Sequence, residues 1–197
     1  MRTEIFYGGW YGVCDFIEFV LSNFPFSSQE RDSFRDACNF WLEREMSAWR
    51  VVGNTVARLT SDEEIEAVDA ACVLEDSFAP AATHARAALT LLSDRKSPDY
   101  RNSIKEAISA VESACRVVTG NPKATLGDAL KQLETKGIRI HSALKASFDK
   151  LYGYTSDEGG IRHSLLEQST VDFEDAKFML VSCSAFVNLL RARSGLS

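Results

Sequence analysis

The residues best suited to chemistry gather in one short polar segment, YGYTSDEGGIRHS. Within it, Arg162 is followed directly by His163, and two glycines precede the pair. Arginine offers a rigid fork of donors that fits a phosphate, and histidine transfers protons near neutral pH. Such a pair could hold a phosphodiester and act on it by acid–base catalysis. Arg162 and His163 are therefore the candidate catalytic residues.

Polar neighbours of this pair are candidate binding residues: Tyr154, Ser156, Asp157 and Glu158. Either of the two acids could orient the ring of His163. The alternative interpretation is structural, because a short helix could begin here with Asp157 or Glu158 paired to Arg162. The spacing of the residues leaves both interpretations open.

The other histidines are better explained by structure. His84 lies in an alanine-rich helical pattern, where we expect a surface or capping role. His141 stands at the start of another helical pattern, where a ring nitrogen can pair with the backbone.

Sequence motifs for other chemistry are missing. The chain has no GxxxxGK[ST] phosphate loop and no GxGxxG, HExxH or GxSxG motif. Its five cysteines are scattered without CxxC spacing, which favours core residues over a disulfide framework or a structural zinc site. We therefore expect no metal and no cofactor.

Composition and charge narrow the class of protein. With 197 residues, 45% of them hydrophobic and 25% charged, the chain resembles a soluble globular protein. It has no run long enough to span a membrane and no signal-peptide pattern, so we expect a cytoplasmic protein without membrane contact. The net charge is −7 over residues 1–96 and +1 over residues 97–197. Because phosphate contacts need basic residues, we expect any RNA or nucleotide site in the second half.

Helical periodicity dominates the first half of the chain. Apolar residues recur three and four positions apart over residues 11–24 and again over residues 28–46. At the start of the second of these helices, Ser27 and Glu30 have the spacing of a capping box.

A small β-hairpin interrupts this helical pattern. Residues 49–60 partly alternate and are rich in β-branched side chains around a Gly-Asn dipeptide. An acidic helix is expected over residues 62–76, with Ser61 as its cap. Its seven acidic residues and lack of basic ones predict a solvated face. An alanine-rich helix over residues 79–93 completes this half.

The second half has the pattern of a helical bundle. A long amphipathic helix begins near residue 99 and ends at Gly120, and two shorter helices follow over residues 125–137 and 141–155. The last helix, over residues 171–194, is apolar around much of its circumference, so we expect it at the centre of the bundle.

We therefore predict a mainly α fold with a small hairpin and two domains. The first domain is the helical module of residues 1–96, and the second is the bundle of residues 97–197. The connection between them is too short for independent motion, so the two halves should share an interface.

Several long segments of the sequence resemble bacterial AbiJ-type abortive-infection proteins. The stretch WRVVGNTVARLTSDEEIEAV is similar to their N-terminal module. The second half, which includes SDRKSPDYRNSIKEAISAVESACRVVTGN and DFEDAKFMLVSCSAFVNLLRA, resembles the HEPN superfamily of helical domains. The resemblance covers about residues 27–194, and it implies an up-and-down helical bundle and a homodimer.

Many HEPN proteins are metal-independent ribonucleases of antiviral defence. They use an arginine followed, after four to six residues, by a histidine, and two protomers join these motifs in a shared cleft. No arginine of this chain has a histidine at that spacing. Arg162 and His163 fall in the expected region, ahead of the last helix. Arg101 and Asn102 are weaker candidates for the same face, where helical spacing places Asn102 beside Glu106.

Two functions follow from this resemblance. The first is a defence protein that acts on or senses RNA or a nucleotide. Such a protein could be a metal-independent ribonuclease that uses Arg162 and His163. The alternative is a non-catalytic HEPN-like module that senses a nucleotide or binds a protein partner from a defence system. The acidic helix over residues 62–76 would then be a docking face. The missing motif spacing and the net acidity favour this alternative.

Overall fold

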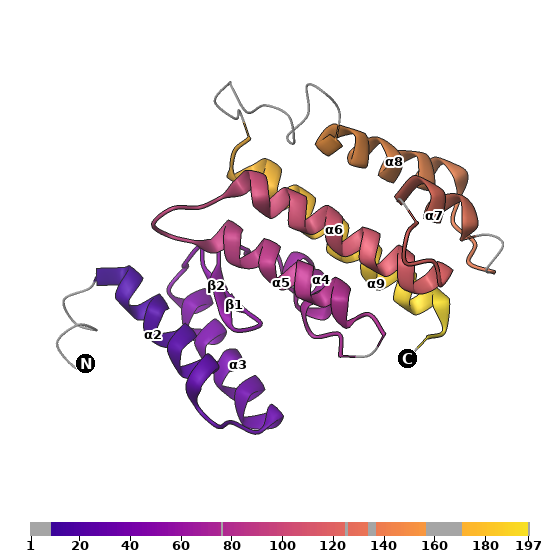
Figure 1. Ribbon diagram of the computed structural model, residues 1–197. Coiled ribbons are helices and arrows are strands. Elements are labelled where there is room, and N and C mark those ends of the chain that lie inside the picture. Colours follow the sequence, from indigo (N-terminus) through magenta and orange to yellow (C-terminus); the bar gives the residue numbers. More distant parts are fainter. Residues whose placement is uncertain (1–8, 76, 125, 134–136, 157–170, 197) are drawn as a thin grey trace.

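The structure is a computed structural model that describes residues 9–75, 77–124, 126–133, 137–156 and 171–196, without the side chains of residues 126 and 154–156. Over the described residues the chain forms eight helices and one antiparallel pair of strands (Figure 1). The predicted mainly α fold with a small hairpin is therefore confirmed. In chain order the elements are α2 (Gly9–Asn23), α3 (Ser28–Arg44), β1 (Arg50–Val52), β2 (Thr55–Ala57), α4 (Asp62–Cys72), α5 (Ala79–Ser93), α6 (Tyr100–Thr119), α7 (Leu126–Gln132), α8 (Ser142–Ser156) and α9 (Phe173–Ser194).

Local signals at the helix ends mostly act as the sequence predicts. At the start of α3, Ser27 Oγ accepts a hydrogen bond from the backbone N–H of Glu30, and the Glu30 carboxylate accepts one from the Ser27 N–H. Gly120 ends α6 in the left-handed conformation, with φ of 67°. The prediction for Ser61 was wrong in one respect. This residue precedes α4, but its hydroxyl donates to the Glu63 carboxylate and caps no backbone group.

The hairpin forms where the sequence predicts it. Val51 pairs with Val56 across the two strands, and the turn between the strands contains Gly53 and Asn54. Gly53 has a φ of 57°, a left-handed conformation that costs glycine little because it lacks Cβ. The strands are only three residues long each, so their stability must come from the elements around them.

Side chains close both outer edges of this hairpin. On β1, the Asn39 side chain of α3 accepts from the Val51 N–H at 2.7 Å and donates to the Val51 carbonyl at 3.0 Å. On β2, Glu18 Oε1 of α2 accepts from the Val56 N–H at 2.8 Å. Arg95, just after α5, binds the Val56 carbonyl at 3.5 Å. The outward backbone groups of both valines are thus satisfied by three separate segments.

Two apolar cores hold the protein together. The smaller core joins α2 and α3 to the hairpin and contains Cys14, Ile17, Leu21, Leu42, Val51 and Val56. The larger core continues from Val52 to Leu190 and includes residues on both sides of residue 96. The division into domains at residue 96 stays a prediction, and at that point α5 packs along α6.

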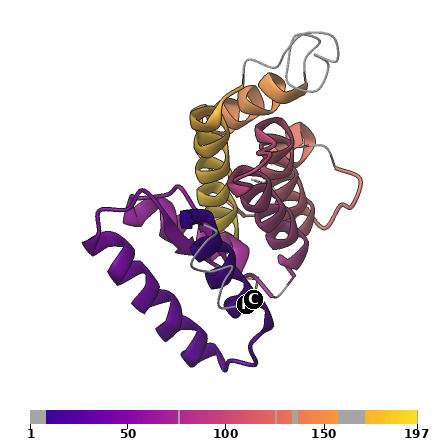
Figure 2. The same cartoon turned by 90° about the vertical axis from the view of Figure 1, so that its left-hand side faces the viewer.

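The long helices occupy the middle of the molecule. Helix α9 lies beside α6 in both views and also contacts α4 and α5, as predicted for a central helix (Figures 1 and 2). Helices α2 and α3 lie together on one side of these long helices (Figure 2). All five cysteines are free, and four of them are buried in the cores. Their distribution agrees with the role predicted for them.

We predict that the amide of Asn39 is needed for stability. Replacing it in Asn39→Leu keeps a similar size but leaves the N–H and carbonyl of the buried Val51 without their partners. We expect the free energy of unfolding to fall by about 2 kcal/mol or more in urea denaturation. The matched control is Asn23→Leu, since the exposed Asn23 side chain bonds only within its own helix. Equal losses in both variants would contradict the edge-closing role.

Candidate functional site

The structure does not place the predicted catalytic pair. Arg162 and His163 lie outside the described residues, as do Asp157 and Glu158. Tyr154 and Ser156 belong to the last turn of α8, where only the backbone is described. The structure therefore does not test whether these residues form a site.

The two weaker candidates lie in the first turn of α6. The Asn102 side chain donates to Asp99 Oδ2 at 2.7 Å, and its backbone N–H donates to Asp99 Oδ1 at 3.0 Å. Asn102 is thus occupied in capping its own helix. Next to it, the Tyr100 ring lies 6.1 Å from the ring of Phe173, between centroids. This end of α6, with Arg101, therefore lies beside the beginning of α9.

The two described histidines have structural partners. His84 Nδ1 of α5 lies 2.6 Å from Glu106 Oε2 of α6, so this histidine joins two helices. The expectation of a plain surface or capping role was too simple, and Glu106 faces His84 across the helix interface. His141 Nδ1 accepts from the Ala143 N–H at 3.2 Å. Its pairing with the backbone at a helix start is confirmed.

A cavity of about 750 Å³ opens in the first half, between α3, the hairpin turn, α4 and α5. Three arginines line it, namely Arg31 and Arg35 of α3 and Arg86 of α5. The sequence analysis missed this site, because charge balance directed attention to the second half. Arg31 and Arg35 are four residues apart and so share one face of a helix. This spacing was the local sequence signal that could have indicated a basic site on α3.

Asp69 compensates the charge of one of these arginines. Its Oδ1 accepts from the Gly53 N–H at 2.8 Å and from Arg35 Nη1 at 3.3 Å. Arg35 also contacts Asp32, at 3.1 Å. Asp69 belongs to the acidic helix that was predicted to present a solvated face, yet it fixes the hairpin turn to α3 and α4. For this residue the prediction of a solvated role was wrong.

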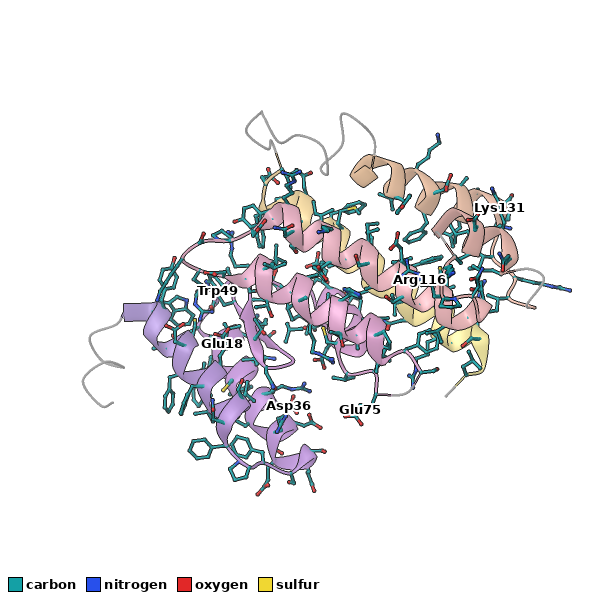
Figure 3. The ribbon with its side chains drawn as sticks, in the orientation of Figure 1. Glu18, Asp36, Trp49, Glu75, Arg116 and Lys131 are labelled. Carbon is teal, nitrogen blue, oxygen red and sulfur yellow. The ribbon has the colours of Figure 1, made fainter. Side chains whose placement is uncertain are left out.

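The other two arginines have no carboxylate partner among the described residues. Arg86 donates to the Cys72 carbonyl and, at 3.3 Å, to the Thr83 hydroxyl, and both of these groups are neutral. Arg31 Nε is buried and lacks a hydrogen-bond partner within the described part of the chain. Glu75 also lines the cavity, but it is exposed on the loop between α4 and α5 (Figure 3). The cavity wall thus has as many acidic as basic side chains, but neither Arg31 nor Arg86 lies within salt-bridge distance of a carboxylate of the described residues.

A second cavity, of about 480 Å³, shows the opposite arrangement around Arg95. The Arg95 side chain is only 7% exposed. It forms salt bridges with Glu18 Oε2, at 2.8 Å, and with Asp15 Oδ1. The hydrogen bonds that Arg95 donates to these carboxylates, that to Glu18 foremost, keep the pKa of Arg95 above its usual value. This arginine is therefore committed to the hairpin edge, in contrast to Arg31 and Arg86.

The lining of the first cavity favours binding over catalysis. Burial raises the pKa of the Cys72 thiol to about 12, so it stays protonated and is a poor nucleophile at neutral pH. Neither of the two described histidines, His84 and His141, lines this cavity. Within the described ranges, no three His, Cys, Asp or Glu side chains are grouped to hold a metal ion. Guanidinium groups without carboxylate partners can instead bind a phosphate by charge-assisted hydrogen bonds.

Comparison with known proteins identifies the first part of the chain. Residues 1–74 match the family model of AbiJ N-terminal domain 4. This segment, which includes α2, α3, the hairpin and α4, is an AbiJ-type N-terminal module, and the match indicates abortive-infection defence. No curated protein and no solved structure matches the chain. None of the described helices is long and apolar enough to cross a membrane.

We predict that Asp69 stabilises the module through its hydrogen bond to Gly53. Asp69→Ala removes the acceptor and leaves Arg35 with Asp32 alone, so we expect unfolding to become easier by about 1–3 kcal/mol. Asp69→Asn keeps an acceptor for the Gly53 N–H and should cost less. Thermal and urea unfolding would measure both, with Asp36→Ala on exposed α3 surface as the control (Figure 3). An equally stable Asp69→Ala protein would contradict this role.

Proposed function

We propose that this protein serves in abortive-infection defence and that its AbiJ-type module senses a nucleotide. The observation that carries this proposal is the cavity with two arginines, Arg31 and Arg86, that no carboxylate of the described residues neutralises. Arg31 is half-buried, and leaving such a guanidinium group without a counter-charge is costly unless a ligand supplies one. Arg86 is exposed and therefore accessible to a ligand. The non-catalytic alternative of the sequence analysis also senses a nucleotide, but it placed the site in the HEPN-like second half, whereas this cavity lies in the first half.

The cavity has the size and the lining that a nucleotide requires. Its volume falls within the range of about 300–1,000 Å³ typical of small-molecule sites. The phosphates would lie between Arg31 and Arg86, where planar guanidinium groups bind two oxygens at once. Phe26 also lines the cavity, and its ring, which stacks on the rings of Phe24 and Phe34, gives the lining an apolar part beside which a base can lie.

Helix α5 gives such a ligand a route to the second half. It carries Arg86 on the cavity side and packs along α6 on the other. The cavity contact and the α6 contact are close together along α5, because His84, which pairs with Glu106 of α6, is only two residues from Arg86. A nucleotide that pulls on Arg86 would therefore act on the interface between α5 and α6.

We predict that Arg31 and Arg86 are required for nucleotide binding. Isothermal titration of the full chain with ATP, GTP and inorganic triphosphate would measure the affinity. Arg31→Gln and Arg86→Gln should each weaken binding at least about tenfold, because each removes a charge-assisted contact worth about 1.5–3 kcal/mol. The matched control is Arg44→Gln, an arginine of α3 whose guanidinium lies over the Trp41 ring, outside the cavity lining.

The result can overturn the proposal in two ways. Absence of binding by all three probes at millimolar concentration would exclude a nucleotide of this kind. A loss in Arg44→Gln equal to that in the cavity variants would show only general attraction between the protein and anions.

A separate outcome concerns the base. Binding of triphosphate as tightly as ATP and GTP would show that the phosphates alone are recognised, without stacking of the base.

A ribonuclease of the HEPN type is the second candidate function. The contact between Tyr100 and Phe173 supports it, because it sets the Arg101 end of α6 beside the first turn of α9. In the chain, α9 follows the segment with Arg162 and His163. In this mechanism Arg162 would hold the scissile phosphate, and His163 would exchange a proton with the ribose 2′-hydroxyl or the leaving oxygen. The HEPN-like bundle, its homodimer, a defence-system protein partner and a cytoplasmic location remain part of this proposal.

Under this second proposal we predict that RNA cleavage needs His163 and no metal ion. Purified protein should cleave total RNA or tRNA in excess EDTA, and His163→Ala should abolish the cleavage while the fold is retained by circular dichroism. His141→Ala is the control, since His141 has its own backbone partner. Cleavage that is unchanged in His163→Ala would exclude the proposed base. Cleavage by neither protein would leave nucleotide sensing as the function.

A further inference from the structure

The outer surface of α2 and α3 is apolar to an unusual degree. Five large side chains of these helices and one of the loop between them are between 37% and 59% exposed, and we call them the aromatic face: Val13, Phe16, Phe19, Phe24, Phe40 and Trp41. On α2, Ile17 and Leu21 point inward to the smaller core, whereas Phe16 and Phe19 do not. Monomeric proteins rarely expose so many large apolar side chains on one pair of helices.

The residues of α3 on this surface have a symmetrical order. Glu30 lies near the beginning of the helix, Arg44 at its end, and Ala37 midway between them. All three are exposed. Successive residues of an α-helix turn by about 100°, so these three positions lie on one face within about 40° of each other. The face therefore has an acid at one end, a base at the other and a small residue at its centre.

Such an order is complementary to itself when two copies of α3 pack antiparallel. In a two-fold contact, Glu30 of one copy meets Arg44 of the other at both ends. Ala37 would lie near the two-fold axis, where its small side chain lets the helices approach. Trp41 would lie on the same face one turn away, and Phe40 would cover one side of the contact. The opposed directions of the two helices would also bring opposite ends of their dipoles together.

The charges of the two end residues are available for this contact. Hydrogen bonds from Ser27 lower the pKa of Glu30, so its carboxylate stays ionised at neutral pH. Only Oε2 of Glu30 takes part in these bonds. The Arg44 guanidinium lies over the Trp41 ring, 4.9 Å from its centroid, and forms no salt bridge with the described residues. Charge at both ends can therefore serve recognition between copies.

The exposed apolar area agrees with a second copy as the occupant. A large aromatic side chain offers about 200 Å², so the aromatic face presents roughly 500–600 Å² at the observed exposures. A standard interface buries about 800 Å² from each partner, and somewhat more than half of that area is apolar. A two-fold contact in which α2 adjoins the paired α3 helices would thus gain its apolar share from the aromatic face.

We propose that a second copy of this chain binds the aromatic face, through antiparallel packing of α3 against α3. The proposal is independent of nucleotide sensing, because it uses none of the residues that line the arginine cavity. It also differs from the homodimer expected of HEPN-like domains, which would form through the second half. Here the AbiJ-type module itself associates.

Sedimentation of full-length variants tests this proposal. The wild-type protein should sediment as a dimer at micromolar concentration. Glu30→Lys and Arg44→Glu each place like charges together at both ends of the interface, so each should raise the dimer dissociation constant at least about tenfold. The double variant Glu30→Lys/Arg44→Glu restores opposite charges and should return the constant to within about threefold of the wild type. Rescue by a second substitution excludes a mere folding defect.

Two further variants sharpen the result. Ala37→Glu sets two carboxylates near the two-fold axis and should also dissociate the dimer, whereas Asp36→Lys, on the same exposed helix, should leave the mass unchanged. A wild-type protein that is monomeric at about 100 μM would overturn the proposal. So would a dimer that persists in both single charge variants, because it would form through another surface.

Discussion

A two-stranded sheet has two open edges, and closing them is the constraint on which this structure depends. The outward N–H and carbonyl groups of Val51 and Val56 lie within the protein, where water cannot satisfy them. Asn39 closes one edge, and Glu18 with Arg95 closes the other. Each of these side chains comes from a different part of the chain. The hairpin therefore fixes α2, α3 and the end of α5 relative to one another, although it contributes only six residues of strand.

The arginine cavity results from the same arrangement. Its wall includes the hairpin turn, whose Gly53 N–H is bound by Asp69, and Asp69 in turn holds Arg35. Once Arg35 is neutralised, Arg31 and Arg86 remain as the groups that can serve a ligand. Helix α5 connects this region to the long helices, because its buried alanines allow close contact with α6. The packing of the long helices and the proposed nucleotide binding thus both depend on α5.

Sequence patterns predicted the elements of this fold better than its site. The capping box of Ser27, the hairpin around Gly53 and the central last helix each leave a local or periodic signal, and all three are present. The contact of Glu18 with Arg95 joins residues 77 positions apart, so no local pattern could reveal it. The residues that line the arginine cavity are likewise far apart in the chain, from Phe26 to Thr90. Overall acidity concealed it, because net charge does not show which acids are already paired with bases.

The role of α5 has a consequence for protein engineering and for natural recombination. The family match ends at residue 74, but Arg86 and Arg95 lie beyond that point. A chimaera joined at residue 74 would keep Glu18 at the β2 edge of the hairpin but lose Arg95, and residues of another protein would replace Arg86 in the cavity lining. A junction after residue 96 would keep these contacts but expose the alanine face of α5 to an unrelated neighbour. Productive exchange of this module therefore requires a receiving protein whose first long helix has evolved, or is redesigned, to fit α5.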